Sequence, residues 1–211
     1  MRNYSLFDRL LLEVDKALQT RSSAQGLAKR PTPQAEQDSD INEEQAKLAA
    51  RLMRVNHSGE VAAQALYQGQ AFTARLESVR EQMQHAADEE IDHLAWCEDR
   101  LEELGSQPSV LNPVWYAGSF AIGALAGLVG DKWSLGFVEE TEKQVVEHLQ
   151  AHLDQIPEDD QQTRVILEQM QIDEAEHGDT AHAAGAAELP LPIRGLMKLT
   201  SKVMTKTSYW I

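Results

Sequence analysis

The amino-acid sequence predicts an all-α protein, most simply a four-helix bundle. Apolar residues recur at intervals of three and four over four long stretches, which is the spacing of one helix face. No alternating run or hairpin turn predicts a strand. The 211 residues suffice for one domain with its own core, and the 42% hydrophobic content argues against disorder. The four helical stretches cover residues 42–72, 77–104, 131–153 and 159–187.

The two ends of the chain differ from this central bundle. Charged side chains interrupt the first twenty residues, which therefore predict a short amphipathic helix rather than a secretory signal. A polar stretch with two prolines follows and predicts a loop. We therefore divide the chain, as one domain overall, into an N-terminal helix and polar loop (1–42), the bundle (43–187) and a basic C-terminal segment (188–211).

The link between the second and third helical stretches is apolar. Residues 104–130 contain no charged side chain. The link is long enough to cross a bilayer, but its two prolines and several glycines argue against a span. We expect a long apolar crossover that packs partly on the bundle and partly against a membrane. Packing in the protein core alone is the alternative.

The C-terminal segment is the basic part of an acidic chain. After Pro192 it carries four basic residues and no acidic residue, interleaved with apolar ones, and it ends near Tyr209 and Trp210. This composition is typical of an amphipathic helix that lies in a membrane interface. A helix docked on the bundle with a solvated lysine face would explain the same pattern.

The charge balance and the cysteine count exclude several classes of function. Thirty-four acidic residues against nineteen basic ones give a net charge of −15, which argues against nucleic-acid binding. Cys97 is the only cysteine, so an intramolecular disulfide framework and a Cys-based zinc ribbon are excluded. Carboxylates and imidazoles remain as ligands for hard and borderline metal ions.

Four acidic residues fall on the apolar faces of the predicted helices, where a solvated charge is not expected. Glu60, Glu90, Glu142 and Glu174 each lie near the middle of a different helical stretch. A buried carboxylate without a partner is energetically costly. Four of them in the middle of four helices therefore need a shared counter-charge.

Two of these glutamates are followed by a histidine on the same helix face. His93 comes three residues after Glu90, and His177 three residues after Glu174. The order Glu, Glu-x-x-His, Glu, Glu-x-x-His is the ligand pattern of ferritin-like carboxylate-bridged bundles. Two Fe(II) ions would balance four glutamates, although such ligands do not separate iron from manganese. We predict a ferritin-like bundle with a metal centre formed by Glu60, Glu90, His93, Glu142, Glu174 and His177.

Other residues are weaker candidates for a role at this centre. His148 and Tyr67 lie on the predicted helices that carry Glu142 and Glu60, and either could line a cavity or contact a ligand. Three aspartates could orient a ligand histidine, with ordinary helix charge as the alternative: Asp92, Asp173 and Asp179.

On the third helical stretch two glutamates compete for the ligand role. The apolar face favours Glu142 over Glu139, and we choose Glu142. Glu139 and Glu89 both lie off the apolar faces of their helices. We expect these two side chains to be solvated.

Five short segments form a further pattern over residues 45–211. They are RLMRVNHSGE (51–60), ALYQGQ (65–70), DEEIDH (88–93), LNPVW (111–115) and DEAEH (173–177). In motif and spacing this pattern resembles the demethoxyubiquinone hydroxylase family. The resemblance implies a di-iron monooxygenase that hydroxylates the ring of a demethoxy polyprenyl quinol in ubiquinone biosynthesis.

The resemblance also implies ligand assignments and partners. Carried over by position, one iron is bound by Glu60, Glu90 and His93 and the other by Glu142, Glu174 and His177, with Glu90 and Glu174 as bridges. The implied partners are the quinol, O2, NADH as electron donor and a membrane surface, with other ubiquinone-biosynthesis proteins and a second copy of the chain as further candidates. The implied location is peripheral, on the cytoplasmic face of the cell (inner) membrane.

Two rival functions agree with the same helical pattern. One is another ferritin-like activity, such as iron oxidation or peroxide scavenging. The other is a lipid-binding scaffold with a vestigial metal site. The uncharged crossover and the basic C-terminal segment argue against the first rival. Neither iron oxidation nor peroxide scavenging needs a surface through which a lipid substrate enters. The presence of all six ligands argues against the second.

Overall fold

The computed structural model describes residues 24–37 and 40–211 of the chain. Within these residues the structure is entirely helical, which confirms the predicted all-α class. The helix predicted within the first twenty residues lies outside the described part. The elements are η1 (Ala24–Gly26), α2 (Glu43–Thr73), α3 (Glu77–Glu103), α4 (Asn112–Val129), α5 (Asp131–Leu153), α6 (Gln161–Ala183) and α7 (Leu191–Ser208).

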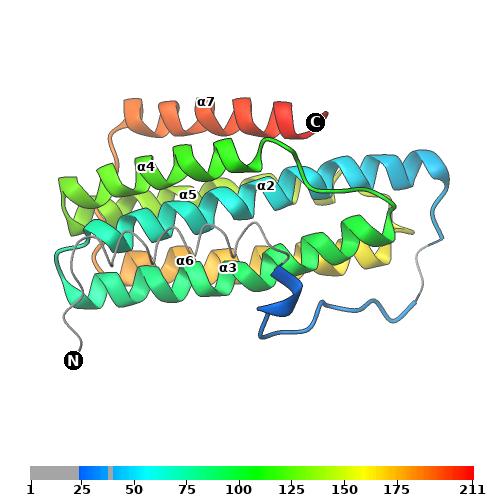
Figure 1. The fold of residues 1–211 in the computed structure, drawn as a ribbon, viewed down its shortest axis with the longest axis horizontal. Helices are drawn as coiled ribbons and strands as arrows, with labels where there is room; N and C mark the ends of the chain where they lie inside the picture. Colours follow the sequence, from blue (N-terminus) through cyan, green and yellow to red (C-terminus); the bar gives the residue numbers. More distant parts are fainter. Residues whose placement is uncertain (1–23, 38–39) are drawn as a thin grey trace.

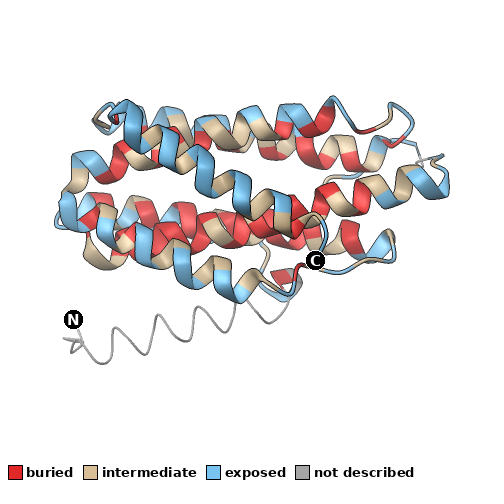
Figure 2. Ribbon diagram, turned by 90° about the horizontal axis from the view of Figure 1, so that it is seen from above, coloured by how far each residue is buried: buried red, intermediate tan, exposed pale blue. Residues whose placement is uncertain are grey.

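The helices α2, α3, α5 and α6 run side by side as an elongated bundle, with α4 along α2 and α7 on the outside (Figure 1). Buried residues follow the inner faces of the bundle helices, whereas α7 is mainly exposed (Figure 2). Two apolar clusters fill the two ends of the bundle, one around Trp96 and Leu149 and the other around Met83 and Leu135. The predicted ligand positions lie between these clusters along each helix.

Local sequence explains where several helices begin and end. Asn42 and Gln45 form a reciprocal capping box at the start of α2. The side chain of Asp160 accepts a hydrogen bond from the backbone N–H of Thr163 at the start of α6. That helix ends at residue 183, four residues before the predicted end, because Gly185 adopts a positive φ of 95°.

The apolar crossover contains a helix of its own. Pro113 lies in the first turn of α4, where a missing N–H costs nothing. The glycines of this segment allow α4 to approach α2 closely. A Cβ atom on Gly123 would overlap the backbone carbonyl oxygen of Leu66, and one on Gly69 would overlap that of Phe120. These glycines therefore mark a close contact between two helices.

We expect Gly123→Ala to destabilise the protein. The added methyl group meets rigid backbone, and overpacking of this kind costs about 1–3 kcal/mol. Gly118→Ala in the same helix is the matched control, since a Cβ there meets open space. Thermal unfolding should show a melting temperature about 3–10 °C lower for Gly123→Ala. Equal melting temperatures for the two variants would contradict the close contact.

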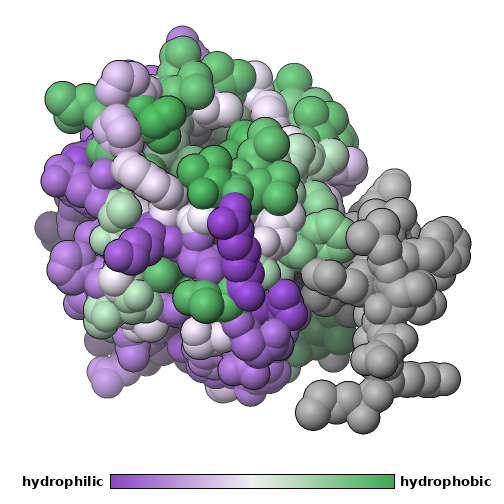
Figure 3. Space-filling model, turned by 90° about the vertical axis from the view of Figure 1, so that its left-hand side faces the viewer, coloured by the Kyte–Doolittle hydropathy of each residue, from purple (hydrophilic) through white to green (hydrophobic). Residues whose placement is uncertain are grey.

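In the described residues no helix combines the length and apolarity that a membrane span requires. The exposed apolar side chains nevertheless gather on two elements. On α4 they include Leu125 and Leu128, and on α7 they include Leu196 and Leu199. Seen from the end where α4 stops and α7 starts, hydrophobic side chains gather over the upper part of the molecule and hydrophilic ones over the lower part (Figure 3).

Candidate metal centre

Four buried glutamates meet in the middle of the bundle, one from each of its helices. Glu60 comes from α2, Glu90 from α3, Glu142 from α5 and Glu174 from α6, and each is at most 3% exposed. Each helix delivers its glutamate inward because that residue falls on the apolar face. Polar groups at one level of four helices thus form a small charged layer between two apolar clusters.

Both histidines of the Glu-x-x-His pairs turn the Nδ1 atom toward these carboxylates. Nδ1 of His93 lies 3.0 Å from Oε1 of Glu174, 3.3 Å from Oε2 of Glu90 and 3.4 Å from Oε2 of Glu60. Nδ1 of His177 lies 3.2 Å from Oε2 of Glu174 and 3.8 Å from Oε1 of Glu90.

The six residues form two overlapping sets that could each hold a metal ion. In each set, one ligand atom per residue can be chosen so that all lie within 4.8 Å of one another. Glu90 and Glu174 belong to both sets, so that either could be shared between two metal ions. The remaining members are Glu60 and His93 in one set and Glu142 and His177 in the other.

The carboxylates of this cluster lack the partners that buried charges require. Both oxygens of Glu142 and Oε1 of Glu90 are buried and have no hydrogen-bond partner among the described residues. Burial, together with the neighbouring charge of Glu174, raises the pKa of both carboxyl groups well above the usual range. Bound cations would offset the energetic cost of burying these carboxylates. A donor set of carboxylate oxygens and imidazole nitrogens fits iron or manganese.

Two further acids hold the outer nitrogens of the histidines. Nε2 of His93 lies 2.9 Å from Oδ2 of Asp173, and Nε2 of His177 lies 3.0 Å from Oε2 of Glu89. Asp173 directly precedes Glu174, and Glu89 directly precedes Glu90. Each Glu-x-x-His motif is therefore preceded by the acid that contacts the histidine of the other motif. With Nε2 carrying the donated proton, Nδ1 is left free to bind a cation.

The structure places the weaker candidates differently. Asp173 contacts His93, one of the two histidines it was expected to orient, whereas the hydrogen bonds of Asp92 go to residues 29 and 30. Glu89, expected in solvent, is 37% exposed but holds His177. Its position immediately before Glu90, like that of Asp173 before Glu174, is the sequence signal that could have identified it.

The two competing glutamates of α5 lie in different environments. Glu142 is 1% exposed and lies within the carboxylate cluster. The side chain of Glu139 is 37% exposed, and its Oε1 lies 3.0 Å from Nδ1 of His182, itself an exposed residue. The geometry favours Glu142 for a ligand role, in agreement with its place on the apolar face of the helix.

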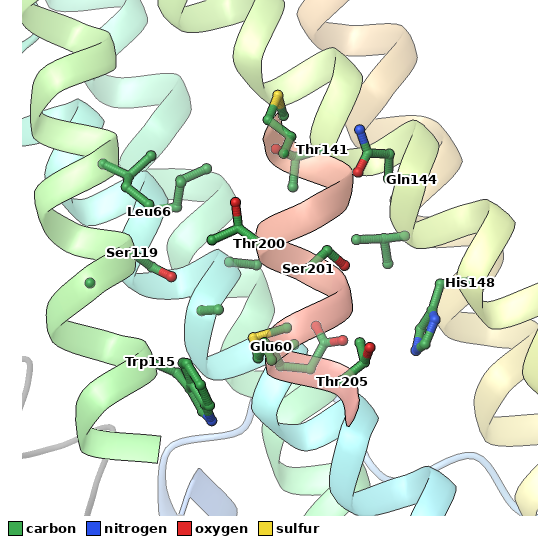
Figure 4. Close-up of a pocket in the computed structure, with 18 of the residues that line it drawn as sticks. Glu60, Leu66, Trp115, Ser119, Thr141, Gln144, His148, Thr200, Ser201 and Thr205 are labelled. Atoms are coloured by element: carbon green, nitrogen blue, oxygen red, sulfur yellow. The ribbon is translucent and has the colours of Figure 1, made fainter. Parts of the chain in front are cut away.

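A largely apolar cavity of about 420 Å³ opens beside the carboxylate cluster. Its walls come from α2, α4, α5 and α7, and it reaches Glu60 and Glu174. Glu60 projects toward this space, with Trp115 and His148 on opposite sides of it (Figure 4). Tyr67 instead packs in the apolar cluster around Met83 and is fully buried.

Comparison with known proteins places the chain in a family. The family model described as "Ubiquinone biosynthesis protein COQ7" matches residues 47–208. The chain belongs to the COQ7 family. Its curated relatives include proteins named 3-demethoxyubiquinol 3-hydroxylase from Ectopseudomonas mendocina (strain ymp), at 58% identity, and from Pseudomonas putida (strain GB-1), at 57%. Both alignments cover 100% of this chain and 98% of the relative.

In this COQ7-family chain the cavity histidine His148 is stacked on a second histidine. The ring centroids of His148 and His152 lie 3.9 Å apart, and Nδ1 of His152 lies 2.8 Å from Oδ1 of Asn56. Burial lowers the pKa of both rings, and the charge of His148 adds to the effect on His152, whose pKa falls to about 3. Both rings are therefore neutral at pH 7.

We expect His152 to make folding stability depend on pH. The unfolded residue titrates near 6.5, so below that pH the unfolded state binds more protons and stability falls, by about 2 kcal/mol at pH 5. His152→Gln lacks this titration. The stability gap between wild type and variant, measured by denaturant unfolding, should shrink by that amount between pH 7.5 and pH 5. A gap of constant size would show that His152 is not held neutral.

Proposed function

We propose that the chain is a di-iron monooxygenase that hydroxylates the ring of a demethoxy polyprenyl quinol in ubiquinone biosynthesis. The observation that carries this proposal is the contact between the carboxylate cluster and the apolar cavity, since the cavity reaches Glu60 and Glu174. The COQ7 family match and the names of the relatives support the same activity.

We assign two irons to the six clustered residues. Glu60 and His93 would hold one iron and Glu142 and His177 the other, with Glu90 and Glu174 shared between them. Two Fe(II) ions would neutralise four glutamates in a core that holds few other charges. When bound, such a pair supplies dioxygen activation, using O2 and reducing equivalents for which NADH is the candidate donor.

The residues of the chain bind and orient the substrate and keep water away. Apolar cavity walls such as Val114 and Ile122 suit an aromatic ring and an isoprenoid tail. Hydroxyl groups of α7, on Thr200, Ser201 and Thr205, line the same space and offer hydrogen bonds to the ring oxygens (Figure 4). The ring would thus lie beside Glu60 at the cluster.

The same cavity connects the site to a surface suited to lipid. Its walls include α4 and α7, the helices that expose the apolar side chains described above. Arg194, Lys198, Lys202 and Lys206 are interleaved with these apolar residues on α7. We assign this surface to peripheral contact with the anionic cytoplasmic face of the cell membrane, from which a polyprenyl substrate would enter.

Vesicle flotation tests the membrane surface. We expect Lys202→Glu to weaken binding to anionic vesicles about tenfold or more, because each charge near such a surface contributes about 1 kcal/mol. Lys29→Glu is the matched control and should bind like wild type, since Lys29 is exposed and belongs to the segment 24–37, which lies across the bundle from α7 (Figure 1). Wild-type protein that stays unbound with both anionic and neutral vesicles would contradict the proposal.

The rival functions predict different measurements. Iron oxidation or peroxide scavenging requires no apolar cavity at the ligands, and a scaffold requires no bound metal. Iron quantification combined with a demethoxyubiquinol hydroxylation assay under O2 and NADH separates these functions. We expect two irons per chain and conversion of the quinol. Peroxide turnover without hydroxylation, or hydroxylation with under one iron per chain, would overturn the proposed function.

A further inference from the structure

Residues 24–37 form a segment that we name the N-terminal strap. It runs along the outside of the bundle beneath α3 in Figure 1. Side chains of α3 and α6 hold it at several points. The backbone N–H of Ala24 donates to Oε2 of Glu98 at 2.9 Å, and that of Ala35 donates to Oε1 of Gln162 at 2.9 Å. Thr32 donates to Asp99 between these two points.

Arg30 is the centre of this strap. Its guanidinium bridges two helices, with Nε 2.9 Å from Oδ2 of Asp92 on α3 and Nη2 2.8 Å from Oδ2 of Asp173 on α6. The guanidinium also lies over the Trp96 ring, 4.7 Å from its centroid. The backbone N–H groups of Lys29 and Arg30 both donate to Oδ1 of Asp92. A planar cation held on three sides in this way has little freedom to move.

Asp173 connects Arg30 to the metal centre. Its Oδ2 accepts from both Nη2 of Arg30 and Nε2 of His93, while its Oδ1 accepts from Gln169 at 2.9 Å. Arg30 therefore holds the carboxylate of Asp173 in place, and Asp173 in turn orients the imidazole of His93. In this orientation Nδ1 of His93 faces Glu174. Groups that orient a ligand histidine in this way typically change metal affinity 10- to 100-fold when they are removed.

Among residues 24–37 and 40–211, no cation holds the outer acid of the His177 set as Arg30 holds Asp173. Glu89 holds Nε2 of His177, but its other ion-pair contact is His85 at 3.6 Å, a side chain that is 74% exposed. The His177 side chain is 12% exposed, whereas that of His93 is fully buried. The two ligand sets thus have the same residue types but are held unequally from outside.

We propose that Arg30 is a positioning residue through which the N-terminal strap retains the metal at the His93 set, so that the two metals leave the centre at different rates. This inference rests on the proposed function, because it requires two bound irons. The metal at the His177 set leaves first, since its histidine is partly exposed and the side chain of its outer acid, Glu89, is 37% exposed. The metal at the His93 set leaves slowly while Arg30 holds Asp173.

Iron release to a chelator tests this assignment. Full-length protein loaded anaerobically with two Fe(II) is mixed with excess ferrozine, and the absorbance of the complex is followed. We expect two phases of equal amplitude. In Arg30→Gln the slow phase should become about tenfold faster or more while the fast phase is unchanged. In Glu89→Gln only the fast phase should change.

Two controls separate positioning from general destabilisation. Lys29→Gln removes the same charge from the neighbouring residue, whose Nζ lies 3.7 Å from Asp88, and should release iron like wild type. Circular dichroism and melting of the metal-free proteins verify that each variant folds. Arg30→Lys should restore the slow phase only in part, because an ammonium group lacks the planar set of donors with which the guanidinium contacts two carboxylates.

The outcomes distinguish this inference from the proposed function. Single-phase release from wild type, an unchanged slow phase in Arg30→Gln, or equal acceleration of both phases would overturn the role of Arg30 while the di-iron activity stands. A folded wild-type protein that binds under one iron per chain would contradict both.

Discussion

Glu142→Ala is expected to abolish quinol hydroxylation and to reduce bound iron from two per chain to one or fewer. Glu142 is the buried carboxylate from α5 in the set that contains His177, and neither of its oxygens has a hydrogen-bond partner in the described part of the chain. The alanine variant would leave the metal proposed at the His177 set without its carboxylate from α5. We expect activity to fall by at least about 10²-fold, more than the loss of an outer-shell partner produces.

The same substitution should increase the stability of the metal-free protein, although it decreases activity and iron binding. Removing a buried carboxylate that lacks hydrogen bonds relieves a cost of about 1–3 kcal/mol. Metal-free Glu142→Ala should therefore melt above metal-free wild type, while added iron should stabilise the variant less. Iron analysis and paired melting curves measure both effects.

Glu139→Ala is the matched control on the same helix. Its carboxylate contacts the exposed His182, so the variant should keep two irons and near wild-type activity. If Glu139→Ala loses iron and Glu142→Ala retains it, the assignment of the α5 ligand is wrong. Full activity in both Glu142→Ala and Glu174→Ala would contradict the di-iron site itself.

Gly59→Phe is expected to stop hydroxylation while the metal stays bound. Gly59 lines the cavity next to Glu60, and a Cβ at this position meets open space. A phenyl ring can therefore grow into the cavity without displacing backbone, and it would occupy space proposed for the quinol ring. Misplacement of a substrate by about 1 Å can cost about 10²-fold in rate, and we expect a loss of at least that size.

Gly59→Ala provides the size control. One methyl group leaves most of the cavity open, and alanine is favoured over glycine within a helix by about 1 kcal/mol. This variant should keep its activity and melt slightly higher than wild type. Iron content should equal that of wild type in both variants. Undiminished hydroxylation by iron-loaded Gly59→Phe would show that the substrate ring binds elsewhere.

Much of the bundle could be predicted because the pattern that defines each helix lies within that helix's own sequence. The periodicity of apolar residues located α2, α3 and α5 to within one residue of their ends, since an amphipathic helix must repeat every 3.6 residues. The end of α6 was missed because a positive φ at Gly185 is a matter of backbone geometry at one residue. In the sequence, the glycines of the crossover only argue against a membrane span, whereas in the structure they permit α4 to contact α2 closely.

The sequence by itself determined the six clustered residues, because charge on an apolar face and a three-residue spacing are properties of single helices. Only the tertiary structure decided which groups surround them. The crossed pairs of His93 with Asp173 and of His177 with Glu89, and the bridge from Arg30, join residues 62 to 143 positions apart. Such contacts depend on how whole helices and the strap are placed, and no local pattern encodes that placement.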